Sequence, residues 1–293
     1  MGIGLSLLKN DFKEKLCAVI LCAGEGKRLK DITKSLPKPL IKIEKLNNIS
    51  ILNHIINNLI NLEINQIAIV IGYLGEAIQE YISSLTKNNE LLQKKLIIID
   101  TEKQYKLGPL YSFLSIIKNS NFFINSNYYI LFPGDTIFDI ELLKEILLLI
   151  SKNYNLIHNY PFIFYRDIEL NALEKIYNRS KLISCAEFKK FAPDIFLRRI
   201  SQIRIRDIIS DDVIRQIVPI FTFNYKFIQE ILELKDTIKV KTIWETFNYM
   251  IDNGRKIYAF RLRTNKEFYD IDTKDDLRNL KKKKDNRRSD YSK

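Results

Sequence analysis

Cysteine and histidine are rare in this chain. Three cysteines and two histidines occur among its 293 residues. Cys17, Cys22 and Cys185 form no Cys-x-x-Cys pair and have no histidine near them, so the sequence suggests neither a disulfide framework nor a zinc site, and we expect reduced thiols. His54 and His158 lie near no plausible nucleophile, and we interpret both as structural.

Long apolar runs are missing as well. No stretch approaches the ~18 consecutive apolar residues of a membrane-spanning helix. The N-terminus also lacks the apolar core of a secretory signal. We therefore expect a cytoplasmic protein with no membrane span. Its 46% hydrophobic and 28% charged residues are typical of a globular protein with a large core.

Acidic residues are too few to balance the basic ones, and the basic excess is uneven. The formal net charge is +12, and residues 281–293 carry seven Lys or Arg against two Asp. This basic tail, which we expect to be disordered, leaves the rest of the chain only moderately basic. A moderate excess suits a protein that binds small polyanions, so we do not expect nucleic acid as a partner.

Apolar runs and helical periodicity alternate from residue 16 onward, after an N-terminal extension of residues 1–15. The run Ala-Val-Ile-Leu at 18–21 is followed by glycines, as a buried parallel strand often is. Because parallel neighbours need a crossover, the alternation predicts an α/β fold with a doubly wound, mostly parallel Rossmann-like sheet. The other strands are predicted at 67–71, 96–99 and 128–132, and the helices at 51–60, 77–85 and 110–118.

Residues 152–218 are less regular. We expect a smaller antiparallel annex there, with strands at 161–165 and 182–186, covering one side of a cleft. Trp244 falls among other apolar positions on a predicted helix, so we assign it to the core. One domain over residues 16–280 is predicted, with the annex inside it. Its later elements are expected at 219–223, 227–234, 243–251, 257–262 and 275–280.

A glycine-rich turn directly follows the first predicted strand. It reads Leu-Cys-Ala-Gly-Glu-Gly-Lys-Arg-Leu at 21–29, and Ser-Leu-Pro-Lys-Pro-Leu follows at 35–40. Such a turn exposes backbone N–H groups to a triphosphate, and Arg28 and Lys38 can supply positive charge. The turn fits neither the Gly-Lys-Ser/Thr of a Walker motif nor Gly-x-Gly-x-x-Gly, because Leu29 stands at the third glycine.

Together, the two runs resemble the sugar-phosphate nucleotidyltransferase family, which includes glucose-1-phosphate thymidylyl- and uridylyltransferases. That family carries Leu-Ala-Ala-Gly-x-Gly-Thr-Arg-Leu and then Pro-Lys-Pro-Leu, and this chain differs at Cys22 and Lys27. The resemblance implies that Arg28 holds the β and γ phosphates and that Lys38 neutralises charge where the new bond forms. It also implies nucleotide-binding positions at Leu21, Ala23, Gly24 and Gly26.

Two aspartates in later motifs are candidate metal ligands. Asp135 follows the strand at 128–132 and should point into the crevice at the carboxyl end of the sheet. The run Phe-Tyr-Asp-Ile-Asp-Thr at 268–273 resembles a second family motif. By resemblance, Asp135 and Asp270 bind Mg²⁺, which prefers such hard oxygen ligands. The local alternatives are Asp139, which also reads as a helix start, and Asp272, which also reads as an N-cap.

Weaker matches concern the base and the acceptor. Gln104 and Gly108 stand where the family uses Gln and a Gly-Thr-Ala segment to contact the base, although the residues after Gly108 depart from that pattern. The family's mid-chain Glu-Lys-Pro lysine, which meets the sugar phosphate, has its nearest match in Glu-Phe-Lys-Lys at 187–190. We assign this role to Lys190, with Lys189 as the alternative, since no proline follows Lys190.

The resemblance implies an Mg²⁺-dependent enzyme that joins a nucleoside monophosphate from an NTP to a sugar 1-phosphate. Pyrophosphate would leave and an NDP-sugar would form. A phosphate monoester is already anionic near neutral pH, so no general base is needed to create the nucleophile. Catalysis then depends on positioning and charge neutralisation, which fits motifs rich in Lys, Arg, Asp and Gly.

Two rival functions fit the same motifs. One is a cytidylyltransferase that acts on a polar head-group phosphate such as phosphocholine or inositol phosphate. The other is a non-catalytic regulatory subunit, which the intact charged positions disfavour. No hexapeptide repeat follows Asp270, so we expect no β-helix domain. The sequence leaves open the base, the acceptor and whether copies form a homo-oligomer.

Overall fold

One mixed sheet dominates the computed structural model, which describes residues 10–125, 128–188, 196–209, 213–235 and 239–280. Four parallel strands form one side of the sheet, in the order β6-β1-β4-β5. They confirm the parallel central part that the sequence predicts. Their bounds are β1 Leu16–Leu21, β4 Gln66–Ile71, β5 Leu96–Asp100 and β6 Tyr128–Pro133.

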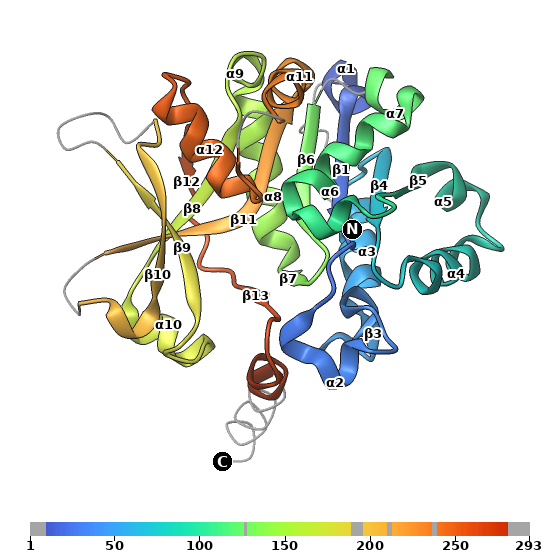
Figure 1. Ribbon diagram of the computed structural model, residues 1–293, viewed down its shortest axis with the longest axis horizontal. Helices are drawn as coiled ribbons and strands as arrows, with labels where there is room; N and C mark the ends of the chain where they lie inside the picture. The colour runs from blue at the N-terminus through green and yellow to red at the C-terminus, as the bar shows by residue number, and fades with distance from the viewer. Residues whose placement is uncertain (1–9, 126–127, 189–195, 210–212, 236–238, 281–293) are drawn as a thin grey trace, which may run out of the picture.

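Mostly antiparallel strands continue the same sheet beyond β6, although β12 pairs parallel with β8. The long strand β11 pairs with β6 through its second half and with β8 from Ile214 to Thr222, and the β8 register shifts between Val218 and Phe221. The annex is therefore an extension of the parallel sheet (Figure 1). The strands beyond β6 are β8 Phe162–Ile168, β9 Leu182–Glu187, β10 Arg199–Arg204, β11 Ile214–Asn224 and β12 Tyr258–Arg261. The end of β11 and all of β12 lie outside the predicted bounds of the annex, 152–218.

Helices cover both faces of the sheet, which confirms the doubly wound arrangement. Alternate residues of β1 face opposite cores, because Ala18 and Ile20 lie in one apolar cluster and Cys17 and Val19 in the other. The first cluster is closed by α3 Ile51–Asn61, α4 Gly75–Thr86 and α8 Ile140–Lys152. The second is closed by α6 Pro109–Leu114, α7 Ser120–Asn125, α11 Tyr225–Leu234 and α12 Ile243–Asp252.

Two expected elements have different bounds in the structure. The helix predicted at 110–118 is divided into α6 and a 3-10 helix, η5 Ser115–Lys118. At the junction, the Ser115 hydroxyl donates to the Tyr111 carbonyl at 3.0 Å, a bond that often bends helices. The strand predicted at 219–223 begins earlier, at Ile214, because its first half pairs inside the annex.

Shorter elements complete the described chain. Within the described residues, no helix is long and apolar enough to cross a membrane. The short helices and strands are α1 Asn10–Lys15, η1 Lys27–Leu29, α2 Lys30–Thr33, η2 Lys38–Leu40, β2 Lys42–Ile43, η3 Glu44–Leu46, β3 Ile49–Ser50, α5 Glu90–Lys95, η4 Gln104–Leu107, β7 Thr136–Phe138, α9 Tyr154–Ile157, α10 Leu170–Ile176, η6 Ile205–Asp207 and β13 Phe268–Asp270, and residues 274–280 are also helical.

The pairing of β13 with β7 brings the end of the domain back to its middle. The two strands are antiparallel, with Asp270 opposite Thr136. Since Thr136 directly follows Asp135, the pairing places both predicted metal ligands beside each other. In Figure 1, β13 lies between the annex and the N-terminal part of the sheet.

Candidate active site

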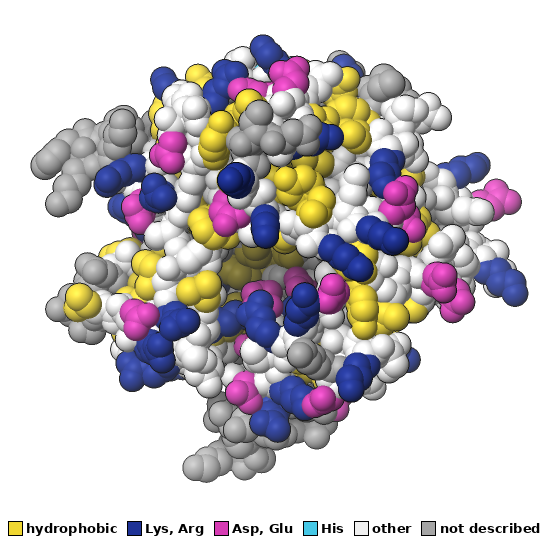
Figure 2. Space-filling view, in the orientation of Figure 1, with side chains coloured by type: hydrophobic (Ala, Val, Ile, Leu, Met, Phe, Trp, Pro, Cys, Tyr) yellow, Lys and Arg dark blue, Asp and Glu magenta, His cyan; other side chains and the backbone are white. Residues whose placement is uncertain are grey.

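A cleft of about 610 Å³ opens at the carboxyl ends of β1 and β6. Open α/β sheets commonly bind ligands at this edge. In Figure 2 the molecule is hollowed near the centre of the visible face, with hydrophobic side chains in its depth and charged side chains along its lower rim. The predicted positions that line the cleft are Leu21, Ala23, Gly24, Gly26, Arg28, Lys38, Asp135 and Asp270.

The glycine-rich turn forms one wall of the cleft. The backbone N–H of Cys22 donates to the Val70 carbonyl at 2.8 Å, which ties the start of the turn to β4. Gly26 has a φ of +62°, a left-handed conformation that favours glycine. A methyl group on Gly24 would meet nothing within 4 Å, so the backbone there is open to a ligand. The turn can therefore present N–H groups to phosphate oxygens.

Lys38 lies at the base of the cleft and is almost fully buried. Its Nζ is 2.6 Å from Asp135 Oδ2 and 3.2 Å from Asp272 Oδ1. Burial by itself would lower the pKa of Lys38, but the carboxylates of Asp135, Asp272 and Asp270 outweigh burial and raise that pKa above its usual value. The ammonium group is thus a fixed positive charge at neutral pH.

Three carboxylates converge next to Lys38. Asp135, Asp270 and Asp272 each offer one oxygen, and these oxygens lie within 4.8 Å of one another. Burial raises the pKa of Asp270 to about 7, and the neighbouring Asp272 and Asp135 add to the rise. Burial also acts to raise the pKa of Asp272, but Lys38 and Lys181 lower it below its usual range. A cluster of hard oxygen ligands fits Mg²⁺.

The two alternative carboxylates differ in their surroundings. Asp139 caps α8, since its side chain accepts a hydrogen bond from the Glu141 backbone N–H at 2.9 Å. Asp272 points into the cleft instead of capping the last helix, and its Oδ1 lies 3.0 Å from Arg28 Nη2. The structure therefore places Asp272 with Asp135 and Asp270, and places Asp139 at a helix start.

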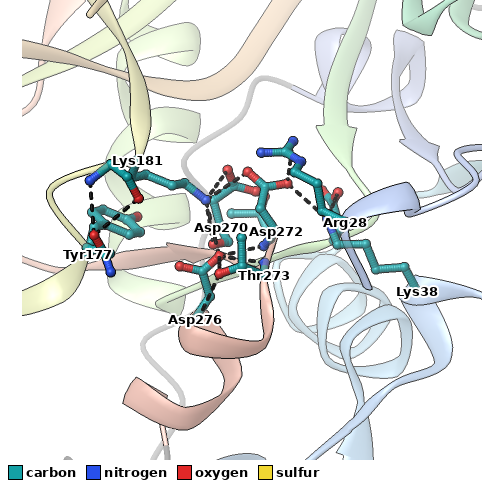
Figure 3. Close-up of polar contacts among 12 residues, drawn as sticks. Arg28, Lys38, Tyr177, Lys181, Asp270, Asp272, Thr273 and Asp276 are labelled. Atoms are coloured by element: carbon teal, nitrogen blue, oxygen red, sulfur yellow. Dashed lines mark hydrogen bonds and ion pairs between the residues drawn. The ribbon is translucent and has the colours of Figure 1, made fainter. Parts of the chain in front are cut away.

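Lys181 is a buried cation that the sequence analysis missed. It directly precedes β9, and its side chain is 6% exposed. Its Nζ lies 2.8 Å from Asp272 Oδ2 and 3.1 Å from Asp270 Oδ2, and it also meets Asp276 at 3.5 Å. Figure 3 shows Lys181 reaching the aspartates from the annex, with Arg28 and Lys38 on the opposite side.

Burial alone would lower the pKa of Lys181, but Asp270, Asp272 and Asp276 outweigh it and raise the pKa. The annex thus contributes a permanent positive charge to the carboxylate cluster. No local signal marks this lysine, because its partner Asp272 is 91 residues away and the segment before β9 shows no motif.

The predicted base-contacting residues do not themselves line the described cleft, but a neighbour of each does. The Gln104 side-chain amide lies 3.0 Å from the Ser115 hydroxyl, and its neighbour Tyr105 lines the cleft. Gly108 has a φ of +129° and is the N-cap residue of α6, whose first residue Pro109 lines the cleft. Lys190 and Lys189 lie outside the described residues.

Comparisons with known proteins agree with this geometry. A family model described as nucleotidyl transferase matches residues 17–161. The D-glycero-alpha-D-manno-heptose 1-phosphate guanylyltransferase of Campylobacter jejuni is 30% identical over 174 residues, which cover 57% of this chain and 72% of that protein. This chain belongs to the sugar-phosphate nucleotidyltransferase family. The resemblance that the motifs carry is therefore confirmed.

A further curated relative and a solved structure match different shares of the chain. The bifunctional protein GlmU of Methanococcus maripaludis strain C5 is 38% identical over 130 residues. These residues are 44% of this chain but only 27% of that relative's length. The inositol-1-phosphate CTP transferase of T. maritima has a TM-score of 0.63 at 17% identity, with 91% of this chain and 95% of that chain covered. This last similarity shows a shared fold over nearly the whole domain.

Proposed function

We propose that this chain is an Mg²⁺-dependent nucleotidyltransferase that joins a nucleoside monophosphate from an NTP to a sugar 1-phosphate and forms an NDP-sugar. The observation that carries the proposal is the meeting of Lys38, Asp135 and Asp270 beside the glycine-rich turn. A phosphate oxygen of the acceptor attacks the α-phosphorus, the bond to the bridging oxygen of the β-phosphate breaks, and pyrophosphate leaves with that oxygen.

The residues of the cleft divide the work of binding and charge neutralisation. Gly24 and Gly26 offer backbone N–H groups to the triphosphate, and Arg28, which is 65% exposed and pairs with Asp272 at 3.0 Å, is assigned to its β and γ oxygens. Lys38 is held at the point where charge develops. Asp135 and Asp270, with Asp272 beside them, would hold Mg²⁺, which neutralises triphosphate charge when bound.

The base and the acceptor phosphate are assigned to the flanks of this centre. We infer that Gln104 and Gly108 fix the segment that meets the base, because each holds η4 or α6 in place. Lys190 is assigned to the acceptor phosphate by its place in the family motif. The names of the relatives include both a guanylyl- and a CTP-dependent enzyme, so every base belongs in the assay.

Pyrophosphate release tests the proposal directly. ATP, CTP, GTP, UTP and dTTP are each incubated with Mg²⁺ and with sugar 1-phosphates or head-group phosphates. Release that needs one NTP and one sugar 1-phosphate together would support the proposal. Release with a head-group phosphate alone would replace the sugar by that acceptor. If NTP binding is detectable but no acceptor supports release, a regulatory subunit becomes the better account.

A further inference from the structure

The side of the cleft next to the annex is lined by apolar residues. Five of them are buried or half-buried positions on strands β6, β10 and β11, and α12 adds two more from its first turn. Trp244, which its spacing assigns to the core, is half-buried and also faces this cleft. We call this surface the acceptor wall, and its members are Leu131, Ile200, Ile217, Pro219, Phe221, Ile243 and Trp244.

The strand part of the acceptor wall lies on the side of the cleft away from the proposed base position, whereas the chain just before α12 contacts the Gly108 segment through the Leu110 N–H, which donates to the Lys241 carbonyl at 3.0 Å. In the sheet, β4 and β5 flank β1 on one side and β6 and β11 flank it on the other. Tyr105, which lines the base side, follows β5, whereas the wall is built on β6, β10 and β11 with the start of α12. With the triphosphate on the turn after β1, the space along the wall remains for the body of the acceptor.

The described part of the wall offers few hydrogen-bonding groups. The indole N–H of Trp244 is one donor in the wall itself. Two neutral hydroxyl side chains lie beside the wall, and each already has a partner. The Thr242 hydroxyl donates to the Glu245 carboxylate at 2.9 Å in a helix capping box. The Ser184 hydroxyl accepts from Gln202 Nε2 at 2.6 Å, which leaves one O–H donor for a ligand.

The backbone of the wall withholds a further donor. The register between β11 and β8 shifts between Val218 and Phe221, which interrupts the ladder there. Pro219 lies in this interruption, lines the cleft and has no N–H. A sugar hydroxyl pressed against this wall would lose its bonds to water and gain none in return, which is unfavourable.

We propose that the acceptor is a deoxygenated sugar 1-phosphate, which turns methyl or methylene groups toward the acceptor wall. The inference rests on the proposed function and adds the chemical class of its substrate. Burial of CH groups against Ile217, Pro219 and Phe221 is favourable, whereas burial of a hydroxyl there is not. For one hydroxyl against an apolar pocket, we expect about 10- to 100-fold discrimination in kcat/KM.

The test compares matched acceptors with the NTP that supports turnover. Glucose 1-phosphate, its monodeoxy derivatives and phosphocholine are assayed by pyrophosphate release. At least one deoxy derivative should exceed glucose 1-phosphate by about tenfold or more in kcat/KM. Equal or better use of glucose 1-phosphate would overturn the proposal while leaving the transferase intact. A preference for phosphocholine over every sugar phosphate would overturn the sugar acceptor.

Two isosteric variants assign the effect to the wall itself. Ile217→Thr adds a hydroxyl to the wall, and Ile217→Val has nearly the same shape without one. The ratio of kcat/KM for the deoxy acceptor to kcat/KM for glucose 1-phosphate should be severalfold lower in the Thr variant than in the Val variant. If both variants keep the same preference, the wall at Ile217 does not set it, and the proposal fails.

A binding measurement separates this proposal from failure of the proposed function. The same acceptors are titrated calorimetrically into protein that holds Mg²⁺ and a non-hydrolysable NTP analogue. Tighter binding of a deoxy derivative than of glucose 1-phosphate supports the wall even if turnover is absent. Tighter binding of glucose 1-phosphate, or equal binding, overturns it.

Discussion

Lys38 Nζ and Asp135 Oδ2 are 2.6 Å apart although 97 residues separate them in the sequence. Lys38 begins η2, and Asp135 follows the end of β6, so the contact joins the two best-marked motifs of the chain. Asp272 also contacts this ammonium group, and Lys181 meets Asp270 and Asp272 from the annex, so two buried cations stand beside three carboxylates. These contacts make the effects of single substitutions predictable.

Asp135→Asn should lower turnover by about 10²- to 10³-fold, because it removes a charged ligand from the proposed metal site. The fold should survive, since Lys38 keeps Asp272 as a partner at 3.2 Å. Steady-state pyrophosphate release at saturating Mg²⁺ gives the loss, and thermal unfolding checks the fold. Turnover close to that of the unaltered protein would remove Asp135 from the mechanism.

Asp139→Asn is the matched control for this substitution. It removes the same charge four residues further on, where the side chain caps α8 through the Glu141 N–H and asparagine caps almost as well. Near-normal turnover is expected. A loss as large as that of Asp135→Asn would show that charge in this region, and not ligation at Asp135, controls the rate.

Lys181→Met should destabilise the metal-free protein by about 3 kcal/mol, because it leaves buried carboxylates without their cation. Mg²⁺ should bind more tightly to the variant, since a competing positive charge is gone. Thermal unfolding in EDTA and in Mg²⁺, with calorimetric Mg²⁺ titration, measures both effects. Lys181→Arg, which keeps the charge, should recover most of the stability. An Mg²⁺ affinity that does not change would contradict the proposed competition.

The centre of the site could be predicted because Gly24, Gly26, Lys38, Asp135 and Asp270 each sit in a local motif. Gly24 and Gly26 follow β1, and Asp135 follows β6, and neighbouring parallel strands expose their carboxyl ends at one edge. Lys38 and Asp270 were placed there by their motifs, and the β7–β13 pairing shows how Asp270 arrives. The alternation of strands and helices is also a local pattern, and it predicts that helices cover both faces of the sheet.

The rest depends on contacts between distant segments without local signals. Lys181 reaches Asp272 because the turn before β9 folds back onto β13, and no periodicity in residues 169–181 predicts that path. The start of β11 was missed because its first residues pair only with the annex. Trp244 was assigned to the core by its spacing, which cannot distinguish a core face from the wall of a cleft.

Gly24→Ala should fold normally yet weaken NTP binding. The added methyl meets no protein atom within 4 Å, but it would project where the triphosphate must approach the backbone. We expect the KM for the NTP to rise about tenfold or more, since the close approach of phosphate to N–H groups is lost. Initial rates over a range of NTP concentrations measure the effect. An unchanged KM would place the triphosphate elsewhere.

Gly26→Ala should fail in a different way. With a φ of +62°, an alanine here costs about 1 kcal/mol, and its methyl would lie 2.9 Å from Thr33 Cγ2. The midpoint of thermal unfolding should therefore fall in this variant and stay constant in Gly24→Ala. If both variants unfold at the same temperature, the left-handed turn at Gly26 is not a structural requirement.

His54 should make the protein less stable below pH 6.5. Burial lowers the pKa of His54, although its hydrogen bond to the Phe138 carbonyl at 2.9 Å and the nearby Asp139 oppose the fall. Because the folded-state pKa is lower than the unfolded-state value of 6.5, the unfolded chain binds the proton first as the pH falls.

His54→Gln, whose amide can still donate to Phe138, should lose less stability than the unaltered protein between pH 7.5 and 5.5. Protonation of Asp270, whose pKa is raised to about 7, makes the folded protein more stable as the pH falls, but this effect is the same in both proteins. The difference between their unfolding temperatures therefore isolates His54, and equal losses would mean that the imidazole is not held in its neutral form.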